Sequence, residues 1–251
     1  MNDTTMQQLQ EYQKRRKAST EARQGTSLKD AFLKLPNEGE IKVRFLPSKE
    51  DNTLFFKEFG EHWLDKQPFI CPKVTNGDKC PICESVRELY NSENKDDKIL
   101  AGKLRAKKQH YANVIVKGKE DEGPKIFKYG IKLSDIIIGY CLDPDYYNIA
   151  DAEKGYDFRI IRERNEADMP QYDKSKPVKN SSSVPNKDLS VWLEKAIDIN
   201  QLVNGFTKTY EEIQEAFSGI VTNKTVDKES PVSSEEFNDD EFIKKINNAI
   251  K

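Results

Sequence analysis

The sequence predicts a β-rich α+β fold with a zinc-stabilised subdomain and C-terminal packing helices. Segments in which apolar and polar residues alternate predict strands, a cluster of cysteines with one histidine predicts a metal site, and apolar residues at helical spacing predict helices near the C-terminus. With 251 residues, 36% hydrophobic and 33% charged, the chain has room for one large globular domain or two small ones.

The expected strands and helices follow in chain order. Strands are expected where β-branched and aromatic residues alternate with polar ones, over 40–46, 54–59, 111–116, 125–129 and 156–164. A short helix is expected between Cys83 and Asn91, and two packing helices over 189–199 and 210–217. Residues 169–186 form a loop rich in proline, serine and lysine, which is either a lid over a ligand or a spacer.

Three of the four cysteines lie in one polar stretch that a histidine precedes. Cys80 and Cys83 flank a Pro-Ile turn, and Cys71 and His62 each have eight residues before the next ligand. This is the composition of a Cys3His zinc site. The polar surroundings argue against core cysteines, and a reducing cytosol argues against disulfides. Four protein ligands leave no position for a catalytic water, so we expect one structural Zn²⁺.

Two other residues bear on this site. His110 is the alternative fourth ligand, although His62 is favoured because it immediately precedes the cysteines. Cys141 has no neighbouring ligand and is expected to be a buried thiol. A zinc hydrolase or deaminase would need an open coordination position and a general base, such as a His-x-Glu, but the residue two after His62 is Leu64.

The stretch from Lys103 to Lys119 is strongly basic. It holds six lysines and arginines, no acid, and the pair His110-Tyr111 at its centre. Single-stranded nucleic acid requires cations for its phosphates and aromatic faces for its unpaired bases. The alternative is ordinary strand chemistry, because tyrosine is common in strands and lysine at sheet edges. The expected phosphate contacts are Arg105, Lys107, Lys108 and Lys128.

The two ends of the chain differ in charge. An N-terminal basic cluster is either a solvated helix face or an arm that folds on an acidic or nucleic-acid surface; it consists of Lys14, Arg15, Arg16 and Lys17. Residues 227–251 sum to a charge of −3, and this acidic amphipathic tail is expected to be disordered until it meets a partner. No apolar run reaches transmembrane length, and the first residues lack a secretory signal.

Several motifs in a shared order resemble the T-even-type bacteriophage single-stranded-DNA-binding (helix-destabilising) proteins. They are VRFLPSK at 43–49, the His62 and Cys-Pro-Ile-Cys set, LYNSENK at 89–95, YANVIV at 111–116, the IFKY strand and QYDKSK at 171–176. The resemblance implies an antiparallel oligonucleotide-binding (OB-fold) barrel with a zinc subdomain. It also implies a cooperative, sequence-nonspecific binder of single-stranded DNA in phage replication, recombination and repair, located in the cytoplasm of the infected host.

The same resemblance implies a division of labour along the chain. Residues 1–30 would be the basic arm for cooperative self-association, 31–222 the DNA-binding core, and 223–251 the tail that binds other phage proteins. The implied tail residues are Phe237, Asp239, Asp240 and Phe242. The implied DNA-binding residues are Tyr90, Tyr111, Tyr129 and Tyr172 as rings, with His110 beside them, and Arg105, Lys107 and Lys108 as the basic run.

Two alternatives to a non-enzymatic DNA binder stay open. A zinc-dependent nucleic-acid enzyme is the less favoured, because a site with four protein ligands is closed. A zinc-stapled adaptor that binds only proteins would explain the acidic tail but not the acid-free basic stretch.

Overall fold

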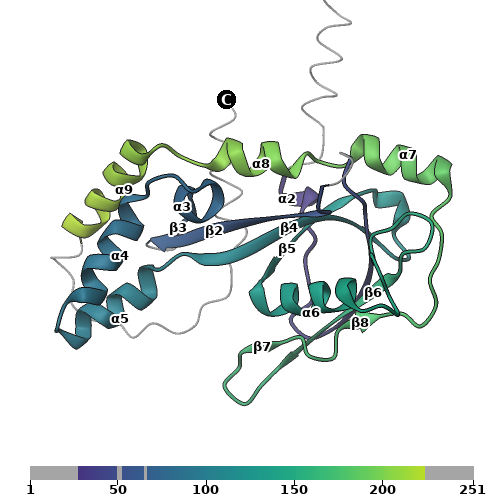
Figure 1. Ribbon diagram of the computed structural model, residues 1–251, viewed down its shortest axis with the longest axis horizontal. Helices are drawn as coiled ribbons and strands as arrows, with labels where there is room; N and C mark the ends of the chain where they lie inside the picture. The colour runs from purple at the N-terminus through teal and green to yellow at the C-terminus, as the bar shows by residue number, and fades with distance from the viewer. Residues whose placement is uncertain (1–27, 50–52, 65–66, 224–251) are drawn as a thin grey trace, which may run out of the picture.

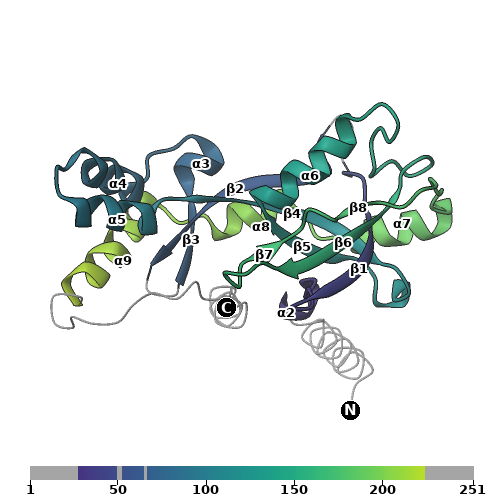
Figure 2. The same ribbon diagram turned by 90° about the horizontal axis from the view of Figure 1, so that it is seen from below.

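The computed structural model describes residues 28–49, 53–64 and 67–223 (Figure 1). The predicted arm residues Lys14 to Lys17 and the tail residues Phe237 to Phe242 lie outside the described residues. Figures 1 and 2 show α3, α4, α5 and α9 gathered at one end of the long strands β2 and β4, with α6 and the strands β6 to β8 toward the other. No helix in the described part is long and apolar enough to cross a membrane.

One antiparallel sheet, with strands of unequal length, runs through the molecule. Its strands are β1 (Gly39–Phe45), β2 (Phe56–Leu64), β3 (Gln67–Cys71), β4 (Lys107–Val116), β5 (Lys125–Gly130), β6 (Asp157–Arg164), β7 (Pro170–Gln171) and β8 (Lys176–Pro177). The order is β3-β2-β4-β1-β6-β7, with β5 on β4 and β8 on β6. Among the described residues the sheet does not close on itself, so the closed barrel is not observed and the OB-fold assignment stays a prediction.

Strand β4 is the centre of this sheet. It pairs with β5 along one edge, and with β2 and then β1 along the other. Ala112 and Val114 pack into the largest core cluster with Phe45 and Phe127, whereas Tyr111 packs into a second cluster that α8 helps to cover. Because both faces of β4 are covered, it reads as a nearly continuous apolar run after its first residues.

The helices lie between and after the strands. They are α2 (Leu28–Ala31), α3 (Pro72–Asn76), α4 (Pro81–Asn91), α5 (Lys95–Leu104), α6 (Ile131–Leu142), α7 (Asn186–Lys195), α8 (Ile199–Phe206) and α9 (Tyr210–Asn223), with a 3-10 turn at Glu120–Glu122. The short helix expected after Cys83 is confirmed as α4. The apolar run at 136–138 lies in α6, which sequence periodicity did not identify because the run has no clear period.

Two helix predictions need correction. The helix expected over 189–199 is α7, which ends earlier, at Lys195, and a separate helix, α8, begins at Ile199. The Asp198 side chain caps α8 by accepting a hydrogen bond from the Gln201 N–H at 2.9 Å. The helix expected over 210–217 continues to Asn223. The strand expected over 54–59 instead runs from Phe56 to Leu64, which places His62 on a strand.

Candidate metal centre and nucleic-acid interface

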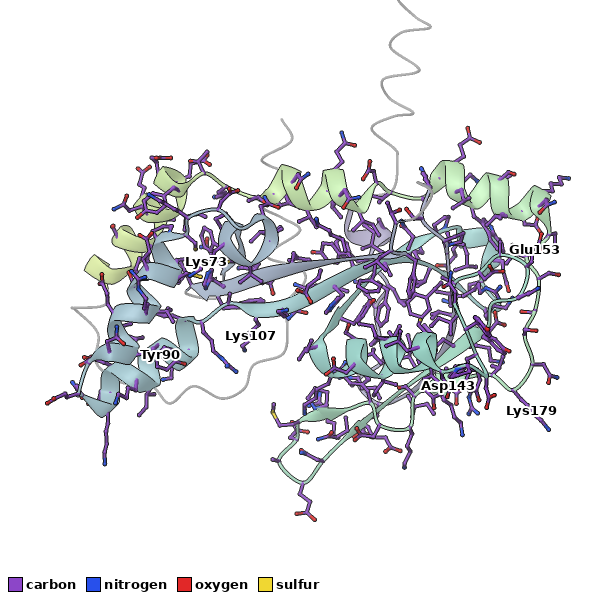
Figure 3. The ribbon with its side chains drawn as sticks, in the orientation of Figure 1. Lys73, Tyr90, Lys107, Asp143, Glu153 and Lys179 are labelled. Carbon is purple, nitrogen blue, oxygen red and sulfur yellow. The ribbon has the colours of Figure 1, made fainter. Side chains whose placement is uncertain are left out.

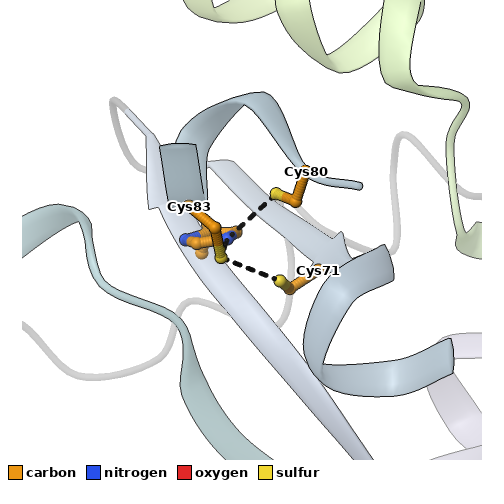
Figure 4. A group of neighbouring side chains, drawn as sticks. Cys71, Cys80 and Cys83 are labelled. Atoms are coloured by element: carbon orange, nitrogen blue, oxygen red, sulfur yellow. Dashed lines mark hydrogen bonds between the residues drawn. The ribbon is translucent and has the colours of Figure 1, made fainter. Parts of the chain in front are cut away.

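Three thiols and one imidazole converge where β2, the end of β3 and the start of α4 meet (Figure 4). Cys71 Sγ lies 3.4 Å from Cys83 Sγ, and His62 Nε2 lies 3.4 Å from Cys80 Sγ and 3.5 Å from Cys83 Sγ. All the ligand atoms lie within 4.8 Å of one another. Tetrahedral zinc with Zn–S bonds of about 2.3 Å places its ligands about 3.8 Å apart. The group can therefore hold one metal ion.

The local sequence explains how the two helices present their thiols. Cys71 immediately precedes α3 and Cys80 immediately precedes α4, and each is followed by proline, which suits the first helical position because its missing N–H has no partner there. The Val74 N–H lies 3.5 Å from Cys71 Sγ and holds the sulfur at the start of α3. Gly77 ends α3 with φ of 84°, a conformation that favours glycine.

Gly60 lets β2 pass close beneath α3. It stands opposite Cys71 in the β2–β3 ladder. A Cβ atom at Gly60 would lie 2.4 Å from Val74 Cβ and 3.0 Å from Cys71 Cβ, so a larger residue would push the metal-ligating segment away from the strand.

A backbone carbonyl orients the histidine. His62 Nδ1–H donates to the Leu104 carbonyl at 2.7 Å, which turns Nε2 toward the thiols. Burial by itself lowers the pKa of His62, but its bonds to Cys80, Cys83 and the Leu104 carbonyl outweigh burial and raise the pKa to about 9. Hydrogen bonds from Cys71 and Cys83 lower the pKa of the Cys80 thiol, and a thiolate is the form that binds metal.

One exposed ring and two exposed cations come from α4 and from the junction of α5 and β4, the part of the chain that follows the metal-site cysteines. Arg105 and Lys107 flank the junction of α5 and β4; both are exposed and neither has an ion pair within the residues that the structure describes. Tyr90, at the end of α4, is 45% exposed, and its hydroxyl lies near Gly102 of α5, one turn before Arg105. Figure 3 shows Tyr90 on the helical lobe and Lys107 at the start of β4.

A family model described as gp32 DNA binding protein like matches residues 37–221, which include the four metal-site residues and all of β4. The chain belongs to this gp32-like family. The match confirms the resemblance drawn from the motifs, and the family is one of DNA-binding proteins rather than a class of enzymes. No curated protein matches the chain.

Burial corrects three of the ring contacts that the sequence predicted. Tyr111 is 0% exposed, with its ring 4.5 Å from that of Phe59 and 5.6 Å from that of Phe32. Tyr129 and His110, 5% and 1% exposed, stack on each other with centroids 5.2 Å apart. The physical reason is that β4, which bears His110 and Tyr111, is covered on both faces, and Tyr129 of the neighbouring β5 packs into the largest core cluster. In this gp32-like chain these rings pack the core and offer no free face to a base.

Tyr172 keeps part of its surface. It follows β7 and packs at the margin of the largest core cluster. Burial raises the pKa of its hydroxyl, and the nearby guanidinium groups of Arg162 and Arg164 act in the opposite direction. Tyr90 and Tyr172 are therefore the predicted rings that retain access to a ligand.

Lys128 is a further correction. Its side chain is only 11% exposed, and its ammonium group lies 2.7 Å from Oε1 of Glu61, whose side chain is 1% exposed. Lys108 is 53% exposed but also paired, at 2.8 Å from Glu58 Oε1. Lys128 thus neutralises a buried carboxylate, whereas Lys108 can exchange its partner for a phosphate. His62, not His110, lies with the cysteines.

Glu58 and Glu61 are the site residues that sequence reasoning missed. The basic stretch has no acid of its own, but the β2–β4 ladder sets Glu58 opposite His110 and Glu61 opposite Lys107. The available signal was the presence of two acids, Glu58 and Glu61, in the segment that forms β2. Only the assembled sheet decides which cations they meet, since Glu61 pairs with Lys128 of β5 rather than with Lys107 opposite it.

Proposed function

We propose that this protein coats single-stranded DNA cooperatively and without sequence specificity, in phage DNA replication, recombination and repair. The family match over residues 37–221 carries this proposal. The exposed residues near the metal lobe supply suitable chemistry, because the cations Arg105 and Lys107 can track phosphates while Tyr90 offers a face to an unpaired base. In the proposal Lys108 extends this surface along β4, and Tyr172, which follows β7 toward the other end of the sheet, is a second stacking position.

In this proposal, different contacts determine the affinity, the preference for unpaired bases and the sequence preference. Phosphate contacts release condensed counterions and dominate the affinity, which makes it depend on salt. Stacking on Tyr90 or Tyr172 selects unpaired bases, because bases in a duplex already stack on their neighbours. Backbone and ring contacts carry little base-edge information, so sequence preference is expected to be weak.

We propose that the metal is a single structural zinc ion held by His62, Cys71, Cys80 and Cys83. Thiolates with one imidazole suit zinc, and four protein ligands leave no open position for a water nucleophile. The ion would supply folding energy to the lobe that bears Tyr90 and Arg105. A non-enzymatic role follows from this closed ligand set.

We propose that the ends act on the DNA-binding core of residues 31–222 without belonging to it. Residues 1–30, through Lys14 to Lys17, would contact a neighbouring copy on DNA and make binding cooperative. Residues 223–251 would bind other replication proteins through Phe237 and Phe242 and the acids between them. We propose that the protein acts in the cytoplasm of the infected host.

The test is a salt titration with labelled oligonucleotides. Fluorescence anisotropy is expected to show tight binding to single-stranded oligo(dT), much weaker binding to the same length of duplex, and a linear fall of log affinity with log salt. Equal affinity for single strand and duplex would contradict the proposal. If the protein binds neither single-stranded nor duplex DNA but still binds a replication protein, a zinc-stapled adaptor is favoured.

A further inference from the structure

One carboxylate joins an exposed lysine to a buried histidine. Glu58 Oε1 lies 2.8 Å from Lys108 Nζ, and Glu58 Oε2 lies 3.3 Å from His110 Nε2. Glu58 stands opposite His110 in the β2–β4 ladder. The exposed fractions are 38% for Glu58, 53% for Lys108 and 1% for His110, so the chain of contacts leads from solvent into the core.

The His110 ring has mostly apolar neighbours. Tyr129 of β5 stacks on its ring, Phe56 of β2 meets it edge-on at 5.5 Å, and Ser134 Oγ of α6 lies 3.1 Å from its Nε2. Burial lowers the pKa of His110; Glu58 acts to raise it, as does the Tyr129 backbone, and Lys108 acts to lower it. The lowered pKa keeps the imidazole neutral near pH 7, and its Nε2 faces both Glu58 and Ser134.

We propose that binding of a DNA phosphate to Lys108 is coupled to proton uptake by His110, with Glu58 as the link between them. This inference rests on the proposed function, because it requires Lys108 to meet a phosphate. When the phosphate takes the ammonium group, Glu58 keeps its charge but loses its cation. Attraction between Glu58 and a protonated His110 is then no longer offset by Lys108, and the imidazole takes one proton from solvent.

The sign of the linkage follows. The pKa of His110 is higher in the complex than in the free protein, so the complex binds more protons and affinity rises as pH falls. The gain is at most about tenfold per pH unit, between the free and bound pKa values of one group. Glu58 is also an internal competitor for Lys108. Removing its charge is expected to tighten binding about 2- to 5-fold at low salt, the range of an exposed ion pair.

The experiment is isothermal titration calorimetry of the full chain with oligo(dT), between about pH 6 and pH 8, in two buffers with different heats of ionisation. Oligo(dT) serves because thymine takes up no proton in this range. The wild type is expected to take up a fraction of a proton on binding, more at lower pH. Glu58→Gln and His110→Asn are expected to take up none. Zinc content is measured for every protein and pH, so that metal loss is seen separately.

Glu40→Gln is the matched control. Glu40 is 37% exposed and pairs with Arg159 on β6, so the substitution removes the same charge from a similar surface pair away from His110. It is expected to keep wild-type proton uptake. Because Glu58 is partly exposed, Glu58→Gln tests the link even if His110→Asn does not fold. If the wild type binds DNA but takes up no proton, or if Glu58→Gln takes up as much as the wild type, the coupling is overturned and the proposed function is not. If none of the proteins binds oligo(dT), the proposed function is overturned as well.

Discussion

Glu61 Oε1 accepts a hydrogen bond from Lys128 at 2.7 Å, and Glu61 Oε2 accepts one from the Trp63 indole N–H at 3.0 Å. The carboxylate is 1% exposed, so these two donors replace the water that it lacks. Lys128, which the sequence analysis expected to contact phosphate, therefore contributes to folding stability instead. The cations available to DNA are those whose partners are solvent or can be exchanged.

Lys128→Ala is therefore expected to destabilise the fold rather than to reduce the salt dependence of DNA binding. It leaves the Glu61 charge buried without its cation, which costs about 3–5 kcal/mol. Urea unfolding measures this loss, and Lys108→Ala is the control because its pair is exposed and is worth about 1 kcal/mol or less. Equal loss of stability in the two variants would contradict the distinction between a buried and an exchangeable pair.

Arg105→Ala combined with Lys107→Ala is expected to have the opposite effect. Both side chains are exposed, so the melting temperature should hold. Loss of two phosphate contacts should make the log-log salt slope shallower by about 1.4, at about 0.7 per contact on single strands. Anisotropy titrations across several salt concentrations measure the slope. An unchanged slope would place the phosphate contacts elsewhere.

The tyrosines, like the lysines, include one expected to bind DNA and one expected to stabilise the fold. Tyr90→Ala should weaken oligo(dT) binding by about 1–3 kcal/mol, with little change in melting temperature or salt slope, because an exposed stacking face is lost. Tyr111→Ala should instead cost about 3–5 kcal/mol of folding free energy, because it opens a cavity beside Phe59. Thermal melts and binding titrations on both variants decide; a Tyr111→Ala protein with normal stability and impaired binding would restore Tyr111 to the interface.

Chelation should lower the melting temperature markedly, because metal binding energy is folding energy in a lobe held by four ligands. Cys83→Ser should reproduce much of the effect and reduce the bound zinc measured by atomic absorption. Cys141→Ser is the matched control, since Cys141 is not among the ligand group. Identical melts with and without chelator would count against a structural metal.

The two ends are expected to act differently. Removing residues 1–20 should preserve affinity for a short oligonucleotide and abolish cooperative filling of a long one, because Lys14 to Lys17 would contact the neighbouring copy. Truncation after Thr222 should raise single-strand affinity, most clearly at low salt, because the acidic tail would no longer compete with DNA for the basic surface. Binding isotherms on short and long strands at two salt concentrations test both; unchanged isotherms would mean that the ends only aid solubility.

The sequence by itself determined the features that depend on short spacing. His62 and the three cysteines fall within one short stretch, so their types and separations identified the candidate metal site before any fold was known. Strands at 40–46, 125–129 and 156–164 were predictable because each carries its own alternation. The family also followed from local motifs kept in order.

Only the tertiary structure decided which basic and aromatic residues face solvent. Alternation along β4 says that Tyr111 and His110 point to opposite faces, but not that both faces are covered. The acids Glu58 and Glu61 reach the basic strand through the β2–β4 register, between segments that are distant in the chain. Burial and ion pairing depend on such distant partners, whose identity local periodicity does not contain.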